Sequence, residues 1–138
     1  MKKRSFILTL LAIAATFGLL VSCNKTEKKI IGSWECTSAE LINPEEGEYL
    51  TMAGANFTFR DDNTVTLINT QGDSVSGTYT ISEDELAITY DYNGWTSILD
   101  MDIQELSKTK LDVEGAMILA LNGATVDTDS LTASFKKL

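Results

Sequence analysis

The chain has 138 residues, 20 of them acidic and 11 basic, and its formal net charge is −9 at pH 7. An acidic surface of this kind repels nucleic acid, so we expect no nucleic-acid partner. The sequence contains no histidine, which excludes histidine-based catalytic triads and most zinc and copper sites.

The first 22 residues have the three parts of a secretory signal peptide. Residues 2–4 are basic, and residues 6–20 form an uncharged apolar run. This run is shorter than the roughly 20 residues that a membrane-spanning helix needs. Residues 20–23 read Leu-Val-Ser-Cys, which places small residues before a cysteine, as lipoprotein processing requires. The sequence therefore predicts cleavage before Cys23.

Lipid on Cys23 is expected to anchor the mature chain to a membrane of the bacterial cell envelope. A diacylglyceryl group, with an added N-acyl chain such as palmitate, gives stable attachment, because two or more chains are needed for firm anchoring. We expect no other cofactor. An aspartate directly after the cysteine retains many proteobacterial lipoproteins in the inner membrane. Here Asn24 occupies that position, which favours the outer membrane. Both a periplasmic and a surface-facing domain are compatible with this segment.

Removal of residues 1–22 leaves a chain that is long enough for one core. The three basic residues of the signal peptide leave with it, so the net charge changes from −9 to −12. Residues 23–29 are polar and unpatterned beyond the cysteine, and we interpret them as a lipidated tether. Residues 30–138 form the folded domain.

From Ile30 onward, apolar residues recur at every second position, which is typical of β-strands. Turn-forming clusters separate the alternating segments, among them Asp61-Asp62-Asn63 and Asn93-Gly94. The alternating segments are residues 34–38, 57–60, 64–67, 75–81, 86–90, 99–104, 111–114 and 131–136. This pattern predicts an all-β fold, a single small antiparallel barrel of about eight strands.

Details within this pattern are also predicted. In the first strand, Trp34, Cys36 and Ser38 are expected to share one face. Gly77 indicates a bulge or a bend. Residues 40–55 contain the only proline and are expected to form a loop with a short strand near residues 49–52. Residues 116–120 lack alternation, and both a strand buried on two faces and a single helical turn are compatible with them; the strand is favoured.

No catalytic residue and no metal site is predicted, and we do not expect an enzyme. With Cys23 lipidated, Cys36 has no disulfide partner, and its strand position predicts a small buried apolar side chain. A cysteine without a histidine lacks the base that would activate it as a nucleophile. Asp100 and Asp102 alternate with apolar residues, which places both carboxylates on a solvated face rather than in a catalytic cleft.

The segment Ile30-Ile31-Gly32-Ser33-Trp34, together with the cysteine motif, the run of hairpins and the closing residues 134–137, resembles the bacterial lipocalin-like lipoproteins of the Bacteroidetes type. The resemblance implies a lipocalin-like barrel in which Gly32 and Trp34 form the motif of the closed end. It also implies that a basic residue near the C-terminus packs across the indole, a role for which Lys136 and Lys137 are the candidates.

The resemblance further implies that the barrel binds a small apolar or amphipathic molecule. The candidate residues for the lining of such a pocket are Phe57, Phe59, Leu99 and Met101. Four aromatic residues are candidates for a stacking platform at the rim, or for core positions if they are buried: Tyr49, Tyr90, Tyr92 and Trp95. The alternative is a filled barrel that acts through its outer surface as an accessory or inhibitor module. The acidic segment 45–48 is then a candidate contact for a protein partner of unknown identity.

Overall fold

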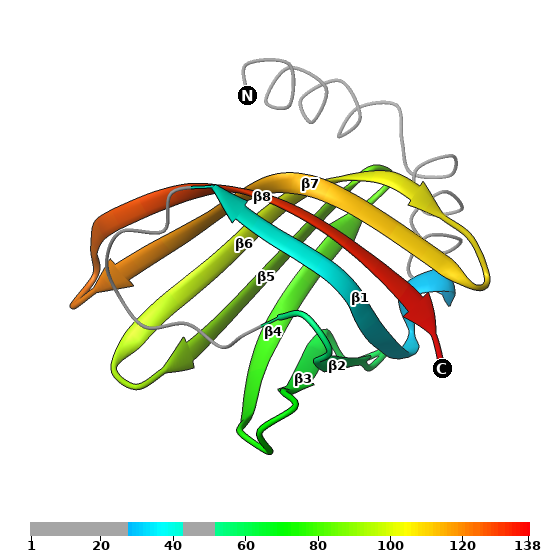
Figure 1. The fold of residues 1–138 in the computed structure, drawn as a ribbon, viewed down its shortest axis with the longest axis horizontal. Helices are drawn as coiled ribbons and strands as arrows, with labels where there is room; N and C mark the ends of the chain where they lie inside the picture. The colour runs from blue at the N-terminus through cyan, green and yellow to red at the C-terminus, as the bar shows by residue number, and fades with distance from the viewer. Residues whose placement is uncertain (1–27, 43–51) are drawn as a thin grey trace.

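The computed structural model describes residues 28–42 and 52–138, and these residues form a closed antiparallel β-barrel. Each strand pairs with the next one along the chain, and the last strand pairs with the first (Figure 1). The strands are β1 (Gly32–Ile42), β2 (Asn56–Phe59), β3 (Thr64–Ile68), β4 (Ser74–Ser82), β5 (Glu85–Tyr92), β6 (Trp95–Leu106), β7 (Lys110–Leu121) and β8 (Ala124–Lys137). The predicted all-β barrel of eight strands is confirmed.

The antiparallel order gives the barrel two distinct ends. The Trp34 end holds residues 28–31, the C-terminus and the turns at 60–63, 83–84 and 107–109. The far end holds the turns at 69–73, 93–94 and 122–123 and the connection from β1 to β2. In Figure 1 the turns at 93–94 and 122–123 lie on the left, and the C-terminus lies on the right beside the short helical stretch at residues 28–30.

The first strand differs from its predicted pattern. A β-bulge shifts the register between β1 and β8 at Cys36 and Ser38. A bulge inserts one extra residue and so reverses the alternation of the side chains that follow it. Ser38 is therefore exposed, not on the face of Trp34, and Ala39 and Leu41 pack against the core instead. The strand also continues to Ile42, so residues 40–42 do not belong to a loop.

The segment without alternation at residues 116–120 lies within β7, which runs without interruption from Lys110 to Leu121. The prediction of a strand is confirmed. Met117 and Leu119 are buried, whereas Ala116 and Ile118 are half-buried. The alternation is not visible in the sequence because the outward-facing residues Ala116 and Ile118 are apolar as well.

Two glycines on separate strands of the barrel wall face inward. Gly77 on β4 and Gly115 on β7 occupy interior positions at which a Cβ atom would meet the backbone carbonyl oxygen of the adjacent strand, Thr89 and Asp100 respectively. The register on both sides of Gly77 is regular. Gly77 therefore does not mark a β-bulge. Its lack of a side chain permits a close approach of β4 to β5, as glycine does at a bend in a barrel wall.

Candidate functional site

The Trp34 end of the barrel is closed by side chains. Trp34 is fully buried, and its indole Nε1 donates a hydrogen bond to the carbonyl oxygen of Ile30 at 2.8 Å. The ammonium Nζ of Lys137 lies 4.7 Å from the centroid of the indole ring. The prediction that a terminal lysine packs across Trp34 is confirmed for Lys137. Lys136 instead forms an exposed ion pair with Glu35, with 3.4 Å between Nζ and Oε1.

Lys137 also ties the N-terminal residues to the barrel. Its ammonium donates hydrogen bonds to the carbonyl oxygens of Ile31, at 2.6 Å, and Lys29, at 3.1 Å. Gly32 lies beneath the lysine stem with φ at +128°, and a Cβ atom there would lie 2.8 Å from Cε of Lys137. Burial lowers the pKa of Lys137, whereas the two carbonyl oxygens and the indole face favour its charged form. The Gly-x-Trp motif thus has a structural role at this end.

Replacing Lys137 with methionine should lower the free energy of unfolding by about 1–2 kcal/mol, because the cation–π contact and the two hydrogen bonds are lost while the apolar stem is kept. The matched change is Lys136→Met, which removes an exposed ion pair with a cost of about 0.5 kcal/mol or less. Urea denaturation of both variants measures the difference. Equal losses would contradict the role given to Lys137.

The predicted pocket-lining residues all lie in the buried core. Phe57, Phe59, Leu99 and Met101 are at most 1 % exposed and belong to one cluster with Trp34. The ring of Phe57 meets the ring of Phe135 edge to face, with 5.0 Å between centroids. Phe59 contacts the ring of Tyr79 in the same way at 5.0 Å. The structure thus brings all four residues together, and their lining of a ligand pocket stays a prediction.

The predicted rim aromatics separate into two groups. Tyr90 is 2 % exposed and faces the interior opposite Ser97, so it belongs to the core. Tyr92 and Trp95 are register partners that flank the turn at 93–94, and both are half-buried against the core. Tyr49 lies outside the described residues, as do Cys23 and the acidic segment 45–48.

Sequence reasoning missed the polar residues that the described part of the barrel buries. These are Asn69, Ser97 and Asp129. All three lie in the half of the barrel that is nearer the far end, which we call the far half. Asn69 has a turn role, because its Oδ1 accepts hydrogen bonds from the backbone N–H groups of Gln71, at 3.0 Å, and Asp73, at 2.9 Å. Ser97 and Asp129 instead lie on the inner face of the strands.

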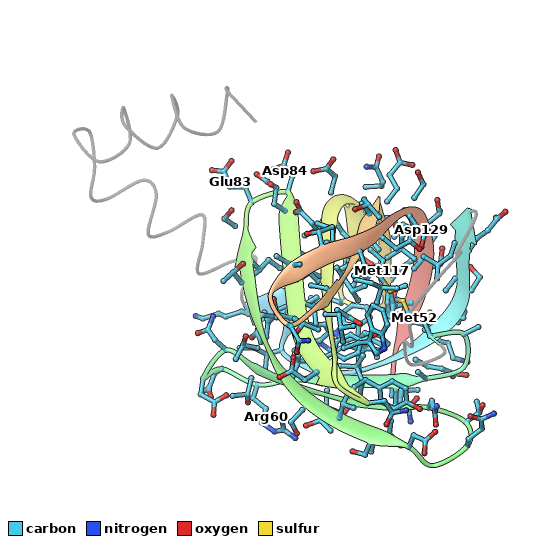
Figure 2. The ribbon with its side chains drawn as sticks, turned by 90° about the vertical axis from the view of Figure 1, so that its left-hand side faces the viewer. Met52, Arg60, Glu83, Asp84, Met117 and Asp129 are labelled. Carbon is cyan, nitrogen blue, oxygen red and sulfur yellow. The ribbon has the colours of Figure 1, made fainter. Side chains whose placement is uncertain are left out.

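The inner position of Ser97 and Asp129 follows from strand alternation. Ser97 is in phase with Leu99 and Met101 on β6. Asp129 is in phase with Leu131, Ala133 and Phe135 on β8, and it lies opposite Met117. Figure 2 looks into the far end and shows Asp129 beside Met117, with Met52 nearby. Extending the alternation of β8 backwards from Phe135 would have found Asp129 in the sequence.

Among the described residues, positive charge is confined to the Trp34 end of the barrel. Within residues 28–42 and 52–138, every basic residue lies at the Trp34 end: Lys28, Lys29, Arg60, Lys108, Lys110, Lys136 and Lys137. Of the charged residues described in the far half, all are acidic, among them Asp73, Asp91, Asp127 and Asp129. The two ends of the described barrel therefore differ in their charged side chains.

A family model described as a lipocalin-like domain matches residues 30–113, which is more than half of the chain. The chain belongs to this lipocalin-like domain family. The matched residues run from β1 into β7, and β8 then closes the barrel. The solved structure titled "Structure of EF1p2_mFAP2b bound to DFHBI" is similar at a TM-score of 0.51 and 14 % identity. The match covers 85 % of this chain and 100 % of that chain, and at this identity it supports the fold. No curated protein matches the sequence.

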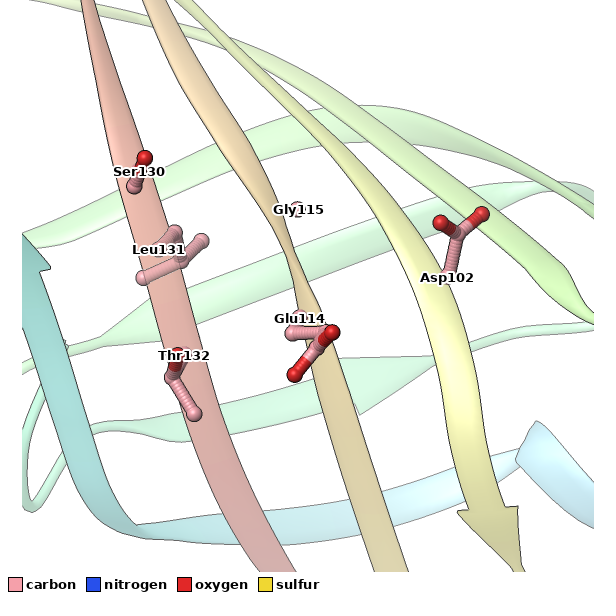
Figure 3. Close-up of a pocket in the computed structure, with 6 residues that line it drawn as sticks. All are labelled: Asp102, Glu114, Gly115, Ser130, Leu131 and Thr132. Carbon is pink, nitrogen blue, oxygen red and sulfur yellow. The ribbon is translucent and has the colours of Figure 1, made fainter.

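Two shallow, polar hollows lie on the outer wall of the lipocalin-like domain among the described residues. The larger, of about 300 Å³, crosses β6, β7 and β8, and Figure 3 shows the carboxylates of Asp102 and Glu114 beside it. Its other lining residues are Gly115, Ser130, Leu131 and Thr132. The smaller, of about 150 Å³, is lined by Thr80, Ile81, Ser82, Glu85, Ala87 and Asp100. Neither hollow contains a residue that was predicted to line a pocket.

Within residues 28–42 and 52–138, the structure groups no three potential metal-ligating side chains. In the same ranges, no helix has the length and hydropathy needed to cross a membrane.

Cys36 is fully buried, as predicted, and its Sγ lies 3.3 Å from the carbonyl oxygen of Ser38. Burial raises the pKa of Cys36 to about 12 from its ordinary value of 9.0.

Cys36 should resist alkylation in the folded protein. A pKa of about 12 reduces the thiolate fraction near pH 8 about a thousandfold, and burial blocks access as well. Iodoacetamide labelling of the Cys23→Ala variant, in which Cys36 is the only thiol, should be slow under native conditions and rapid in guanidinium. Because the folded pKa is raised, unfolding releases a proton above pH 9, and stability should fall between pH 9 and 12. Rapid native labelling would contradict this prediction.

Proposed function

We propose that this chain is a lipid-anchored envelope protein whose lipocalin-like barrel binds a small amphipathic molecule in the far half of its interior. The observation that carries the proposal is that, among the described residues, Ser97 and Asp129 are the buried strand residues with short polar side chains, and both lie in this half of the interior. Small-molecule sites are mostly apolar, with a few placed polar groups that orient the ligand. An eight-stranded barrel is wide enough to hold one small ligand.

Two comparisons support binding as the activity of this barrel. Lipocalin-like barrels are generally binding proteins rather than enzymes. The structural neighbour, too, was solved bound to DFHBI. The interior of this chain fits binding better than catalysis, since a serine without a histidine lacks the base that a nucleophile needs.

The anchor determines how the barrel is presented. We propose cleavage before Cys23, lipid on its thiol and attachment to the outer membrane, on the strength of the signal peptide and of Asn24. Residues 28–31 pack at the Trp34 end through Ile30 and Lys137. The tether therefore joins the barrel at its closed end, which faces the membrane. The far end then points away from the membrane, toward the aqueous phase from which a ligand enters.

Metabolic labelling with palmitate tests the anchor, and the second cysteine provides a matched control. The unmodified chain and the Cys36→Ala variant should both incorporate label and fractionate with membranes. The Cys23→Ala variant should incorporate none. Label that persists in Cys23→Ala, or an unmodified chain without label, would overturn the lipoprotein proposal.

Native mass spectrometry of the mature protein, purified from membranes of its own host, tests ligand binding. We expect a non-covalent adduct that is lost on unfolding, in addition to the covalent lipid. A mass of polypeptide and covalent lipid alone, repeated across independent preparations, would contradict the carrier function. That result would favour the alternative in which the barrel is filled and acts on a protein partner through its outer surface.

A further inference from the structure

The inner wall of the far half combines a buried hydroxyl group with an aromatic edge. We infer that this part of the wall takes an uncharged ligand, which hydrogen-bonds to Ser97 through a hydroxyl or carbonyl group while its apolar body packs beside Trp95. The inference rests on the proposed function, because it names the ligand class of the same interior site. Three features of the described residues support it: the hydrogen bonding of Ser97, the strand register and the burial of the neighbouring side chains.

Ser97 presents a hydroxyl group to the interior of the barrel. The residue is fully buried and shares the inner face of β6 with Leu99 and Met101. Within residues 28–42 and 52–138, its Oγ has no hydrogen-bond partner. A buried hydroxyl group in this state lowers the stability of a fold, and most buried polar groups in native structures avoid that cost by forming a hydrogen bond. A bound ligand that offers a hydrogen-bonding atom would remove the cost at Ser97.

Strand register places Ser97 next to an aromatic edge at the far end of β5, β6 and β7 (Figure 1). Two rows of register partners cross these strands, an inner row of Tyr90, Ser97 and Leu119 and an outer row of Tyr92, Trp95 and Leu121. All six positions are in phase with the buried residues of their own strands, so the side chains of both rows face inward.

Exposure changes sharply between the two rows. The inner row is at most 2 % exposed, whereas Leu121 is 38 % exposed and Tyr92 and Trp95 are half-buried. The rows are two residues apart along each strand, which corresponds to about 7 Å. A ligand whose body packs on the outer row therefore needs a polar group that extends over this distance to reach Ser97. A short alcohol arm on an aromatic ring has that reach.

The surroundings of Ser97 favour an uncharged polar group. Leu99 and Leu119 are fully buried beside it, and one hydroxyl group offers too few hydrogen bonds to offset the burial of an ionised group. Asp129 lies opposite Met117, the next inward position of β7, and it has an interaction of its own within the chain. The site therefore does not call for a cation. Because the charged residues described in the far half are acidic, a carboxylate ligand is disfavoured as well.

Phenethyl alcohol, phenethylamine and phenylacetate test the charge preference on the mature chain. The three probes share an aromatic ring with a short arm, and at neutral pH their head groups are neutral, positive and negative. Titrations followed by proton–nitrogen NMR should give at least tenfold tighter binding for the alcohol than for either charged probe. The amide shifts that the alcohol causes should centre on residues 90–97 and 119–121, which contain the two rows.

Ser97→Ala separates a binding role from a structural one. Without a ligand, the variant should unfold at the same urea concentration as the unmodified chain or at a higher one, because it removes a buried hydroxyl group without a partner. It should nevertheless weaken the binding of phenethyl alcohol about fivefold, which is the effect of one hydrogen bond. The matched control is Ser130→Ala on the exposed outer wall, which should leave the affinity within about twofold.

Trp95→Ala tests the outer row. The variant should weaken the binding of all three probes by a similar factor, because they share the ring that packs there. Near-ultraviolet circular dichroism reports whether each variant is folded. An unchanged affinity for phenethyl alcohol in folded Trp95→Ala would overturn the placement of the ligand body.

Failure of this inference can be distinguished from failure of the proposed function. Equal or tighter binding of a charged probe, or an unchanged affinity for the alcohol in Ser97→Ala, would overturn the inference and leave binding in the barrel standing. If no probe binds but native mass spectrometry finds a molecule retained from the host, the inference is wrong and the proposed function stands. A retained molecule that is ionised at neutral pH would also overturn the inference. If no probe binds and no molecule is retained, both are wrong.

Discussion

Replacing Trp34 with alanine should lower the free energy of unfolding by about 3–5 kcal/mol, which is the range for removing a large aromatic side chain from a core. Trp34 is fully buried and belongs to the same cluster as Phe57. Its loss also removes the donor to Ile30 and the surface over which Lys137 lies. A typical domain has only about 5–15 kcal/mol of stability. The variant should therefore be close to its unfolding limit.

Urea denaturation measures this loss, and the second tryptophan provides the control. Trp95 is half-buried beside a turn at the far end, so Trp95→Ala leaves less of a cavity and should cost about 1–2 kcal/mol. Trp34→Phe keeps most of the apolar volume, so it should fall between the two. A loss below 1 kcal/mol for Trp34→Ala would contradict the view that Trp34 closes the barrel.

Much of the fold could be predicted because strand alternation is a direct geometric consequence of the backbone. Successive side chains point to opposite faces, so Leu99 and Met101 could be assigned to the core from sequence alone. The bulge at Cys36 and Ser38 could not, because it depends on the pairing of β1 with a strand almost a hundred residues away. Local sequence carries little information about which of two strands contains an extra residue.

The inward positions of Ser97 and Asp129 were not predicted from the sequence, for a different reason. Predicted strands were defined by their apolar members, so the strand ending at Lys136 was expected to begin at Leu131. The structure extends β8 back to Ala124, which continues the inward phase of the strand to Asp129. The rule that acidic residues face water is reliable for most positions, and its failures concentrate at sites with a function. The same rule correctly placed Asp102 on the outer wall.

Under the proposed function, the Trp34 end stabilises the barrel and the far half binds the ligand. At the Trp34 end, aromatic packing, the lysine over the indole and the hydrogen bonds to residues 29–31 hold the first and last strands together. At the far half, Ser97 and Asp129 lower the apolar content of the interior, which reduces the stabilisation available from burial there. Under this proposal, the stability of the Trp34 end offsets the cost of the polar groups that the far half buries.

Replacing Gly115 with alanine should destabilise the barrel by about 3 kcal/mol, at the upper end of the range for overpacking. In most strand interiors the opposite sign is expected, since alanine is preferred to glycine by about 0.5–1 kcal/mol. Here the added Cβ would meet the carbonyl oxygen of Asp100 and lie 2.7 Å from Cα of Met101. Both atoms belong to the backbone of β6, which cannot rotate away as a side chain would.

The control is Gly94→Ala, where φ is +83° and no atom lies within 4 Å of the added Cβ. Its cost arises from the backbone conformation alone and should be about 1 kcal/mol. Thermal and urea unfolding measure the loss of stability in each variant. The comparison separates the cost of a steric clash at Gly115 from the cost of a positive φ at Gly94. A neutral or stabilising effect of Gly115→Ala would mean that β6 and β7 do not approach as closely as the structure has them.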